Sequence, residues 1–183
     1  MTSIRKLLIS TSLMLAVSAG AVLANPMVGG SAMYPTKNII QNALKSKDHT
    51  TLVAAVKAAG LVDTLMGAGP FTVLAPTNEA FAMLPAGTVD TLLKPENKAT
   101  LVKILTCHVI AGKVMAATIA KMAKDDGGVH EVKTVGGCML KFSAKGGKVT
   151  ITDEKGGTAK VTIADVRQSN GVIHVIDHVL LPK

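Results

Sequence analysis

Apolar residues recur at helical spacing in the first part of the chain after its N-terminal run. Within residues 39–66, apolar side chains recur three or four positions apart, which is the spacing of helices that bury one face. Asp48 is a good N-cap, and Gly60 and Gly67 are good C-terminal stops. These punctuating residues divide the stretch into three expected helices.

A compact apolar run at residues 71–75 interrupts the helical pattern and predicts a buried strand. Pro76 ends this strand, and Thr77 is placed to cap a helix that carries Phe81. The helical spacing then returns in two further segments, at residues 89–93 and 98–105.

Beyond residue 105 the pattern changes from helical spacing to alternation. Short runs of alternating apolar and polar residues are separated by Gly-Gly and Asn-Gly pairs, which favour tight hairpin turns. Helices first and strands afterwards predict a single α+β domain. The last run is apolar on both faces, so we expect a central strand that is covered on both sides. The expected strands are residues 107–110, 130–135, 138–144, 148–153, 159–166 and 172–181.

The N-terminus has the three parts of a secretory signal peptide. Arg5 and Lys6 precede an apolar run of about 17 residues, and Ala24 stands at a small-residue cleavage position. The run is short for a bilayer span of roughly 20 residues, and an uncleaved membrane anchor is the alternative. We expect a secreted, periplasmic or cell-surface protein with no integral membrane segment after cleavage. The expected segments are a signal peptide at residues 1–24, a leader at 25–35 and the domain at 36–182.

Composition narrows the range of partners. The chain holds three Phe, one Tyr and no Trp, whereas proteins that read single-stranded nucleic acid need aromatic platforms for the bases. Loss of Arg5 and Lys6 with the signal peptide takes two positive charges from the formal +8 and leaves +6. Nearly all the remaining cations are Lys, scattered singly along the chain, while phosphate readers use clustered Arg. We therefore expect a solvated basic surface and no nucleic-acid partner.

Three ordered motifs resemble those of the fasciclin domain family. Residues 71–81, Phe-Thr-Val-Leu-Ala-Pro-Thr-Asn-Glu-Ala-Phe, resemble the first signature, and residues 170–182, Asn-Gly-Val-Ile-His-Val-Ile-Asp-His-Val-Leu-Leu-Pro, resemble the second. Residues 104–113 resemble the family's Tyr-His segment, with Cys107 where the family usually has Tyr. The resemblance implies N-terminal helices packed on a wedge-shaped β-sandwich of about seven strands. It also implies a secreted or surface-attached adhesion protein without catalytic activity.

Four polar residues lie within these motifs. His108 and His174 fall in apolar strands, and Thr77 and Asn78 form the turn after the first signature. The family pattern suggests that the four share one buried polar network. The alternative is that the two histidines bind a ligand. A further histidine, His49, is expected at the surface.

Catalytic and metal-binding patterns find little support. His174 and His178 would stand about 13 Å apart on a strand with a rise of ~3.3 Å per residue, too far to share one zinc ion. Cys107 and His108, adjacent on an expected strand, would point to opposite faces and could not act as a nucleophile and its base. The sequence contains no P-loop, dinucleotide-binding or Gly-x-Ser-x-Gly pattern. We expect no catalytic residue, no metal and no cofactor.

The two cysteines form a candidate pair. An even number of cysteines in an exported chain suggests a disulfide between Cys107 and Cys138, both in expected strands. The loop that it closes, about 32 residues, corresponds to a stabilisation of roughly 3–4 kcal/mol. Two buried free thiols are the alternative, because sequence spacing does not show that the Cα atoms lie within ~7 Å of each other.

The resemblance places partner contact in the second signature, at Ile176, Asp177 and His178. The alternative is that Asp177 only hydrogen-bonds within the fold or faces solvent. The expected function is adhesion to a cell-surface or matrix protein or polysaccharide. A periplasmic carrier or sensor of a small apolar ligand is the alternative from another class. Attachment of the lysines to acidic polysaccharide or to an anionic membrane is a third possibility.

Overall fold

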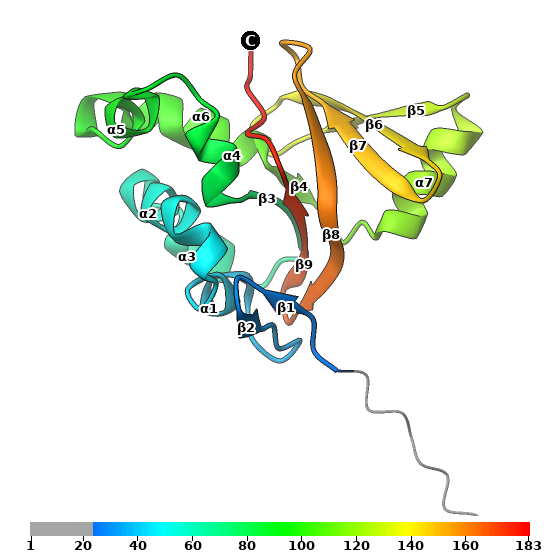
Figure 1. Cartoon of the computed structure of the whole chain (residues 1–183), viewed down its shortest axis with the longest axis horizontal. Helices are drawn as coiled ribbons and strands as arrows, with labels where there is room; N and C mark the ends of the chain where they lie inside the picture. The colour runs from blue at the N-terminus through cyan, green and yellow to red at the C-terminus, as the bar shows by residue number, and fades with distance from the viewer. Residues whose placement is uncertain (1–23) are drawn as a thin grey trace, which may run out of the picture.

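The computed structural model describes residues 24–183, so the expected signal peptide, apart from Ala24, lies outside the described residues. Most helices gather on one side of a curved sheet, and α7 lies at the far end of the strands (Figure 1). Within residues 24–183, none of the helices combines the length and apolarity of a membrane-spanning helix. The helices are α1 (Ile39–Ala43), η1 (Lys47–His49), α2 (Thr50–Ala59), α3 (Val62–Met66), α4 (Asn78–Ala82), α5 (Thr88–Leu92), η2 (Pro95–Asn97), α6 (Lys98–Cys107) and α7 (Ala116–Asp125).

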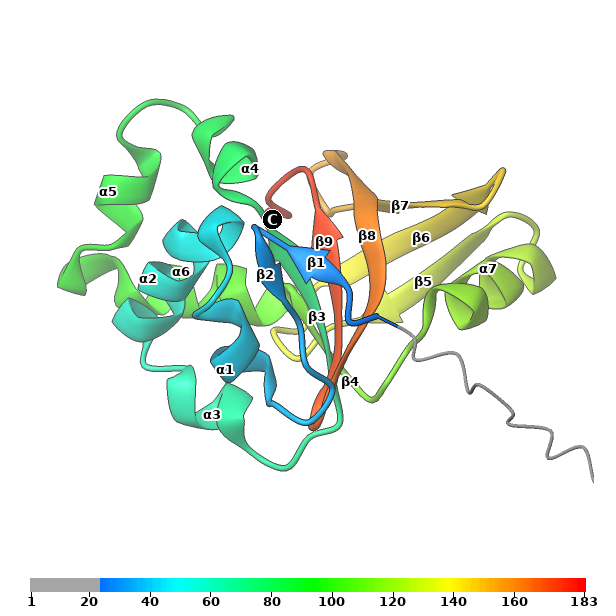
Figure 2. The same ribbon diagram turned by 60° about the horizontal axis from the view of Figure 1, so that its bottom comes forward.

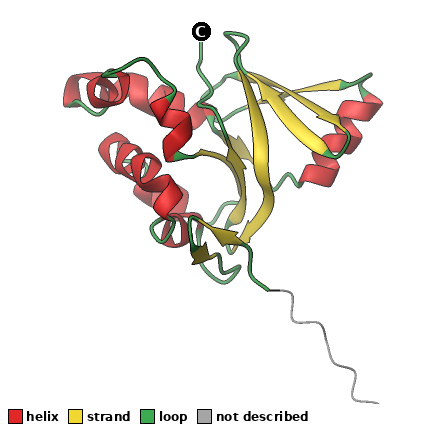
Figure 3. Cartoon of the chain, in the orientation of Figure 1, coloured by secondary structure: helices red, strands yellow, loops and turns green. Residues whose placement is uncertain are grey.

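Seven strands form one mixed sheet in the order β4-β3-β9-β8-β7-β6-β5, which curls toward a barrel (Figure 3). A separate two-stranded hairpin, β1 (Met27–Val28) and β2 (Ser31–Ala32), precedes the helices. The predicted α+β class, with helices packed on about seven strands, is confirmed. The strands of the main sheet are β3 (Phe71–Pro76), β4 (Val109–Ala111), β5 (Val129–Lys133), β6 (Met139–Lys145), β7 (Lys148–Thr152), β8 (Thr158–Gln168) and β9 (Gly171–Ile176).

β9 lies inside the sheet, between β3 and β8 (Figure 2). It runs parallel to β3, with Phe71 opposite Gly171, and antiparallel to β8. All six of its residues are buried, which confirms the expected strand covered on both sides. The remaining pairs in the main sheet are antiparallel, and those among β5, β6, β7 and β8 agree with the Gly-Gly turns that separate these strands.

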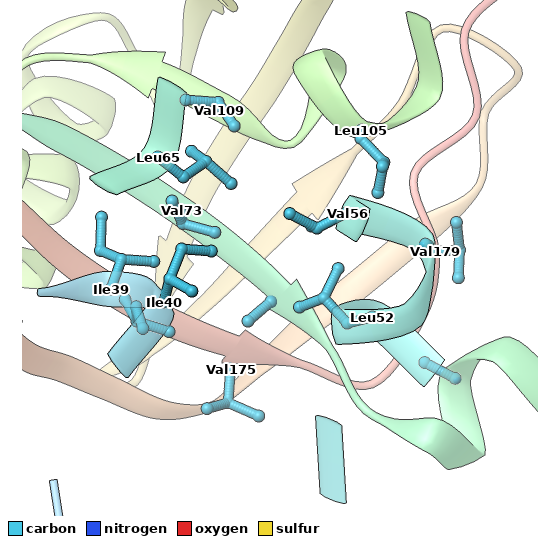
Figure 4. Packing of buried hydrophobic residues seen from close by; sticks show 14 of the residues in the cluster. Ile39, Ile40, Leu52, Val56, Leu65, Val73, Leu105, Val109, Val175 and Val179 are labelled. Atoms are coloured by element: carbon cyan, nitrogen blue, oxygen red, sulfur yellow. The ribbon is translucent and has the colours of Figure 1, made fainter. Parts of the chain in front are cut away.

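The buried side chains form two clusters on the two faces of the sheet. In the first, Ile39, Val73 and Val175 pack with residues from α2, α3 and α6 (Figure 4). The second lies inside the curl of the sheet and is covered by α7, with Phe142 among its fully buried side chains. β9 contributes to both clusters, because neighbouring strand residues such as Val175 and Ile176 point to opposite faces.

Helix α7 is an element that the sequence patterning missed. Its buried residues Ile119 and Ala123 stand four positions apart, the spacing of one helical face. The other side of the helix carries Lys121 and Lys124, so α7 is amphipathic, and the expected elements overlooked a local signal that the sequence contains. The backbone N–H of Ala116 at the start of α7 donates to the Asp165 carboxylate on β8 at 2.8 Å. This cap comes from a distant strand and leaves no local signature.

Two expected strands have different limits in the structure. The sequence predicts that a strand begins at Cys107, but Cys107 is the last residue of helix α6 and His108 is its C-cap. The prediction that the final strand runs to Leu181 is also wrong, because β9 ends at Ile176. The following segment leaves the sheet as a bend.

Residues 25–35, which the sequence predicts as a leader, carry the β1–β2 hairpin packed on the helical core. Val28 and Met33 are 4% and 2% exposed. Gly29 has φ +57°, and a Cβ at this position would collide with Ser46 Oγ and the backbone of Lys47. The close approach of the hairpin to the helices therefore requires glycine, and the segment is part of the folded unit.

Candidate functional site

The turn after β3 caps two helices. The Thr77 hydroxyl accepts a hydrogen bond from the backbone N–H of Ala80 at 3.3 Å, as the sequence predicts for the N-cap of α4. Asn78 Oδ1 accepts a hydrogen bond from the backbone N–H of Thr51 at 3.0 Å, in the first turn of α2. Asn78 therefore supplies the cap that the sequence assigned to Asp48, which instead lies within η1.

His108 ties the C-terminal segment to helix α6. Its Nδ1 lies 2.8 Å from the carbonyl oxygen of Ile104, and its Nε2 accepts a hydrogen bond from the backbone N–H of Leu180 at 2.9 Å. These partners require a neutral ring with the proton on Nδ1. Burial lowers the pKa of His108 to about 4, although the bond to the Ile104 carbonyl opposes this shift.

His174 ties the middle of the sheet to the loop before α7. Its Nδ1 accepts a hydrogen bond from the backbone N–H of Asp165 at 3.2 Å, and its Nε2 lies 2.8 Å from the carbonyl oxygen of Val114. The neutral ring therefore carries its proton on Nε2, the opposite tautomer to that of His108. Burial lowers the pKa of His174, and the bond to Val114 opposes the shift.

Hydrogen bonds do not join these four residues into the single predicted network. Thr77 and Asn78 cap helices, His108 holds the C-terminal segment, and His174 holds the loop before α7. Both ring nitrogens of each of the two histidines face backbone groups. The four side chains therefore form three separate sets of hydrogen bonds, because each side chain bonds to backbone groups and not to the other three.

A disulfide joins Cys107 to Cys138, with 5.4 Å between the Cα atoms. Both residues are buried, at 1% and 3% exposure. The predicted placement of both cysteines in strands is wrong: Cys107 ends α6, and Cys138 lies just before β6. The bond therefore links the helical part of the molecule to the strands that follow.

His49 is buried, so its predicted surface position is wrong. It is 3% exposed, and its Nδ1 lies 2.8 Å from Ser46 Oγ. Within the part of the chain that the structure describes, its Nε2 has no well-formed hydrogen bond. Burial lowers the pKa of His49. The charged neighbours of His49 in the sequence suggest a surface position, but the packing of α2 against the sheet turns the ring inward.

The segment after β9 forms an exposed corner at Asp177 and His178. Asp177 Oδ1 accepts a hydrogen bond from the backbone N–H of Lys160 at 2.7 Å and lies 2.8 Å from His178 Nδ1. Burial opposes ionisation of Asp177, but the bond from Lys160 and the contact with His178 outweigh it and lower the pKa of the carboxyl. Ile176 is fully buried, so this third predicted contact residue is not accessible to a partner.

Sequence reasoning did not find the residues that hold the C-terminal segment. Asp153 Oδ2 accepts a hydrogen bond from the backbone N–H of Leu181 at 2.8 Å, and Glu154 Oε2 accepts one from Lys183 at 3.1 Å. In the sequence Asp153 and Glu154 read as the start of a Gly-rich turn, which they also form. The hydrogen bonds to the C-terminal segment join residues 28 and 29 positions apart, so no local sequence pattern signals them.

Two small apolar cavities lie beneath the helices. One has a volume of about 40 Å³ and is lined by α1, α2 and β3 residues, and the other has about 30 Å³ and includes His49. An engineered cavity that accepts benzene has a volume of roughly 150 Å³. These volumes do not favour a carrier for a small apolar ligand. Among residues 24–183, no three His, Cys, Asp or Glu side chains are placed to hold a metal ion together.

Comparisons with known proteins agree with these features. A family model of the fasciclin domain matches residues 47–182. Protein sll1483 of Synechocystis sp. is 50% identical over 156 residues, which are 85% of this chain and 79% of that protein. Transforming growth factor-beta-induced protein ig-h3 of Sus scrofa is 36% identical over 82% of this chain and 20% of that protein. A FAS1 domain pair from the insect cell adhesion molecule fasciclin I shares the fold, with a TM-score of 0.71 at 18% identity over 79% of this chain and 51% of that chain.

Proposed function

This chain belongs to the fasciclin domain family, and we propose that it is a secreted or cell-surface interaction protein that acts by contact and not by catalysis. Proteins of this family generally act in adhesion and extracellular interaction. We propose that Asp177 and His178 form the contact point with a cell-surface or matrix protein or polysaccharide.

The geometry of the corner is the observation that carries this proposal. Asp177 uses one carboxylate oxygen, Oδ1, for its bonds within the fold. Its other oxygen, Oδ2, accepts no hydrogen bond from residues 24–183 and is free to meet a donor. The side chain of His178 is 46% exposed next to it. A fixed carboxylate beside an exposed ring presents a small polar contact whose position is set by the sheet, which lowers the entropy lost on binding.

The state of the buried histidines supports a role without catalysis. A general base needs a ring nitrogen within hydrogen-bond reach of a substrate. In His108 and His174 both ring nitrogens face backbone groups, and both rings are buried. These side chains stabilise the fold and are not placed to transfer protons to a bound molecule.

An adhesion assay tests the proposal. The mature protein, immobilised on beads, should retain intact cells of the source organism, and Asp177→Asn with His178→Ala should reduce the retained fraction severalfold. His130→Ala is the matched control, because His130 also pairs with a neighbouring carboxylate, Asp126, at 2.6 Å on another part of the surface. Equal retention by the corner variant and the control variant would contradict a contact at Asp177 and His178.

We also propose that the chain is exported and cleaved after Ala24, which leaves residues 25–35 and 36–182 in the mature protein. The charged and apolar parts of the N-terminus support this proposal. N-terminal sequencing of the protein recovered from the cell envelope or the medium should give Asn25 as the first residue. Recovery of protein that begins at Met1 or Thr2 would support the uncleaved anchor instead.

A further inference from the structure

The outward face of strands β5–β8 gathers lysines that are scattered in the sequence. Along each of these strands, alternate residues pack into the second cluster, fully buried on β6 and β7 and partly buried on β5, and α7 covers this cluster from inside. The residues between them are exposed or half-buried and point away from that cluster. The lysine face consists of Lys133, Lys141, Lys145, Lys148 and Lys160, with the hydroxyl residues Ser143, Thr150, Thr152 and Thr158 between them.

Strand register places these side chains next to one another. Lys145 on β6 lies directly opposite Lys148 on β7, and Thr150 on β7 lies opposite Lys160 on β8. With strands ~4.8 Å apart and a rise of ~3.3 Å per residue, neighbouring lysines of the face stand roughly 5–13 Å apart. The cations that the sequence spreads over residues 133–160 therefore form one array in space.

Two carboxylates, Glu131 beside Lys141 and Asp177 beside Lys160, offset only part of the charge of this array. Glu131 Oε1 lies 3.6 Å from Lys141 Nζ. The two side chains are 56% and 58% exposed, so water screens the attraction between them. Among residues 24–183, the other four lysines of the face take part in no salt bridge. Like charges directly opposite each other in a sheet, as at Lys145 and Lys148, repel and destabilise the pair. A bound polyanion relieves this repulsion.

We propose that the lysine face binds an acidic polysaccharide. Lysines are point charges that suit separate carboxylates along a polymer, whereas compact phosphates are better recognised by converging Arg forks. The Ser and Thr hydroxyls between them can donate to and accept from sugar hydroxyls. The only Phe, Tyr or Trp of these four strands, Phe142, is buried in the second cluster, and His130, paired with it, lies on the same inner face. The lysine face therefore has no platform on which bases could stack.

This assignment goes beyond the contact proposed at Asp177 and His178 and rests on other side chains, although the corner adjoins the face at Lys160, whose backbone N–H donates to Asp177. An anionic membrane is the other partner with suitable charge. Binding to a bilayer is strengthened by apolar side chains that enter the headgroup region. The large exposed apolar side chains of this face are Val129 and Met139, both toward its β5 edge. The hydroxyl-rich centre of the face fits a hydrated polymer better.

Binding of the mature protein to polygalacturonate tests the proposal, with neutral dextran and phosphatidylserine vesicles as comparison ligands. The variant Lys145→Gln/Lys148→Gln/Lys160→Gln should bind polygalacturonate at least about tenfold more weakly than the wild type. Lys45→Gln/Lys57→Gln/Lys94→Gln removes the same charge from exposed sites on the helical side and should keep most of the affinity. Binding should fall steeply with added salt.

Three results would overturn the assignment. The wild type could fail to bind polygalacturonate, the two triple variants could lose affinity equally, or the protein could bind phosphatidylserine vesicles more tightly than the polysaccharide. The corner variants at Asp177 and His178 should bind polygalacturonate at least as tightly as the wild type does, because Asp177→Asn removes a negative charge beside Lys160. Loss of cell retention without loss of polygalacturonate binding therefore separates the two proposals. Circular dichroism of each variant checks that it is folded.

Discussion

The helical half of the molecule and the strand meander after α7 are held together in different ways. In the helical half, buried amide side chains join segments that are far apart: Asn170 Oδ1 accepts the backbone N–H of Ile39, 131 residues away, and Asn42 bonds to Gln168. In the meander, each strand pairs with its neighbour in sequence, and the cross-strand side-chain bond between Ser143 and Thr150 spans seven residues. The helical half therefore depends on a few buried side chains, whereas the meander shares its stability among many local pairs.

The largest effect is expected at Asn170. Substitution to alanine leaves the Ile39 N–H and the carbonyls of Leu65 and Gly67 without a partner. Each buried group left unpaired costs roughly 1–3 kcal/mol, so Asn170→Ala should lower the free energy of unfolding by about 5 kcal/mol. Urea unfolding followed by circular dichroism measures the change.

Asn97→Ala is the matched control, because Asn97 makes a single bond, to the carbonyl of Thr91, in an exposed position. It should destabilise by less than about 1 kcal/mol. A similar loss in both variants would show that the helical half does not depend on the buried amide.

The disulfide joins the two halves, and its removal should have the next largest effect. Cys107→Ser/Cys138→Ser should lower the free energy of unfolding by roughly 3–4 kcal/mol, because the unfolded chain regains the freedom of a 32-residue loop. Thermal unfolding with and without a reductant should give the same difference in the wild type. Non-reducing mass spectrometry should show no free thiol, and alkylation at both cysteines would contradict the bond.

Acid should lower the free energy of unfolding through His108, which joins helix α6 to the C-terminal segment. Its pKa is lowered to about 4 in the folded state, so between about pH 6.5 and pH 4 the unfolded state binds a proton that the folded state does not. Stability is therefore full above about pH 6.5 and falls as the pH drops toward 4, by about 3 kcal/mol. The lowered pKa values of His49 and His174 add to the loss in the same direction.

Urea unfolding across this pH range measures the slope. His108→Gln keeps an acceptor for the Leu180 N–H but cannot titrate, so its stability should vary less with pH than that of the wild type. An unchanged slope in this variant would assign the acid sensitivity to other groups.

The smallest effect is expected within the meander. Thr150→Ala removes the hydroxyl contact with Ser143, 2.6 Å long and only partly buried. A cross-strand pair of this kind contributes roughly 0.2–1 kcal/mol, so the midpoint of urea unfolding should hardly move. A loss comparable to that of Asn170→Ala would remove the distinction between the two halves.

The same difference explains what the sequence could predict of the fold. The all-apolar run of β9 and the Gly-Gly pairs of the meander are local signals, and they gave a central strand and its antiparallel neighbours. Thr77 signalled its own helix cap. Asn170 and Asp165 carry no such signal, because their partners lie far away in sequence. Local sequence patterns therefore predicted which helices and strands form, whereas contacts between distant residues determined where some of them begin and end.

The candidate sites follow the same rule. The cysteine count pointed to the pair Cys107 and Cys138, although Cys107 lies in a helix and not in a strand. The burial of His49 comes from packing and could not be foreseen from its charged neighbours. The lysine face needs the register of three hairpins, since a shift of one residue would turn Lys145 or Lys148 to the other side of the sheet.

The parallel pairing of β3 with β9 also sets the order in which the chain can fold. When a chain emerges from a ribosome or a translocation channel with its N-terminus first, Phe71 emerges long before its partner Gly171. Until then the helical core lacks the strand that closes one side of it. Contacts of such high sequence separation form slowly and late. The helical core is therefore completed only when nearly the whole domain has been synthesised.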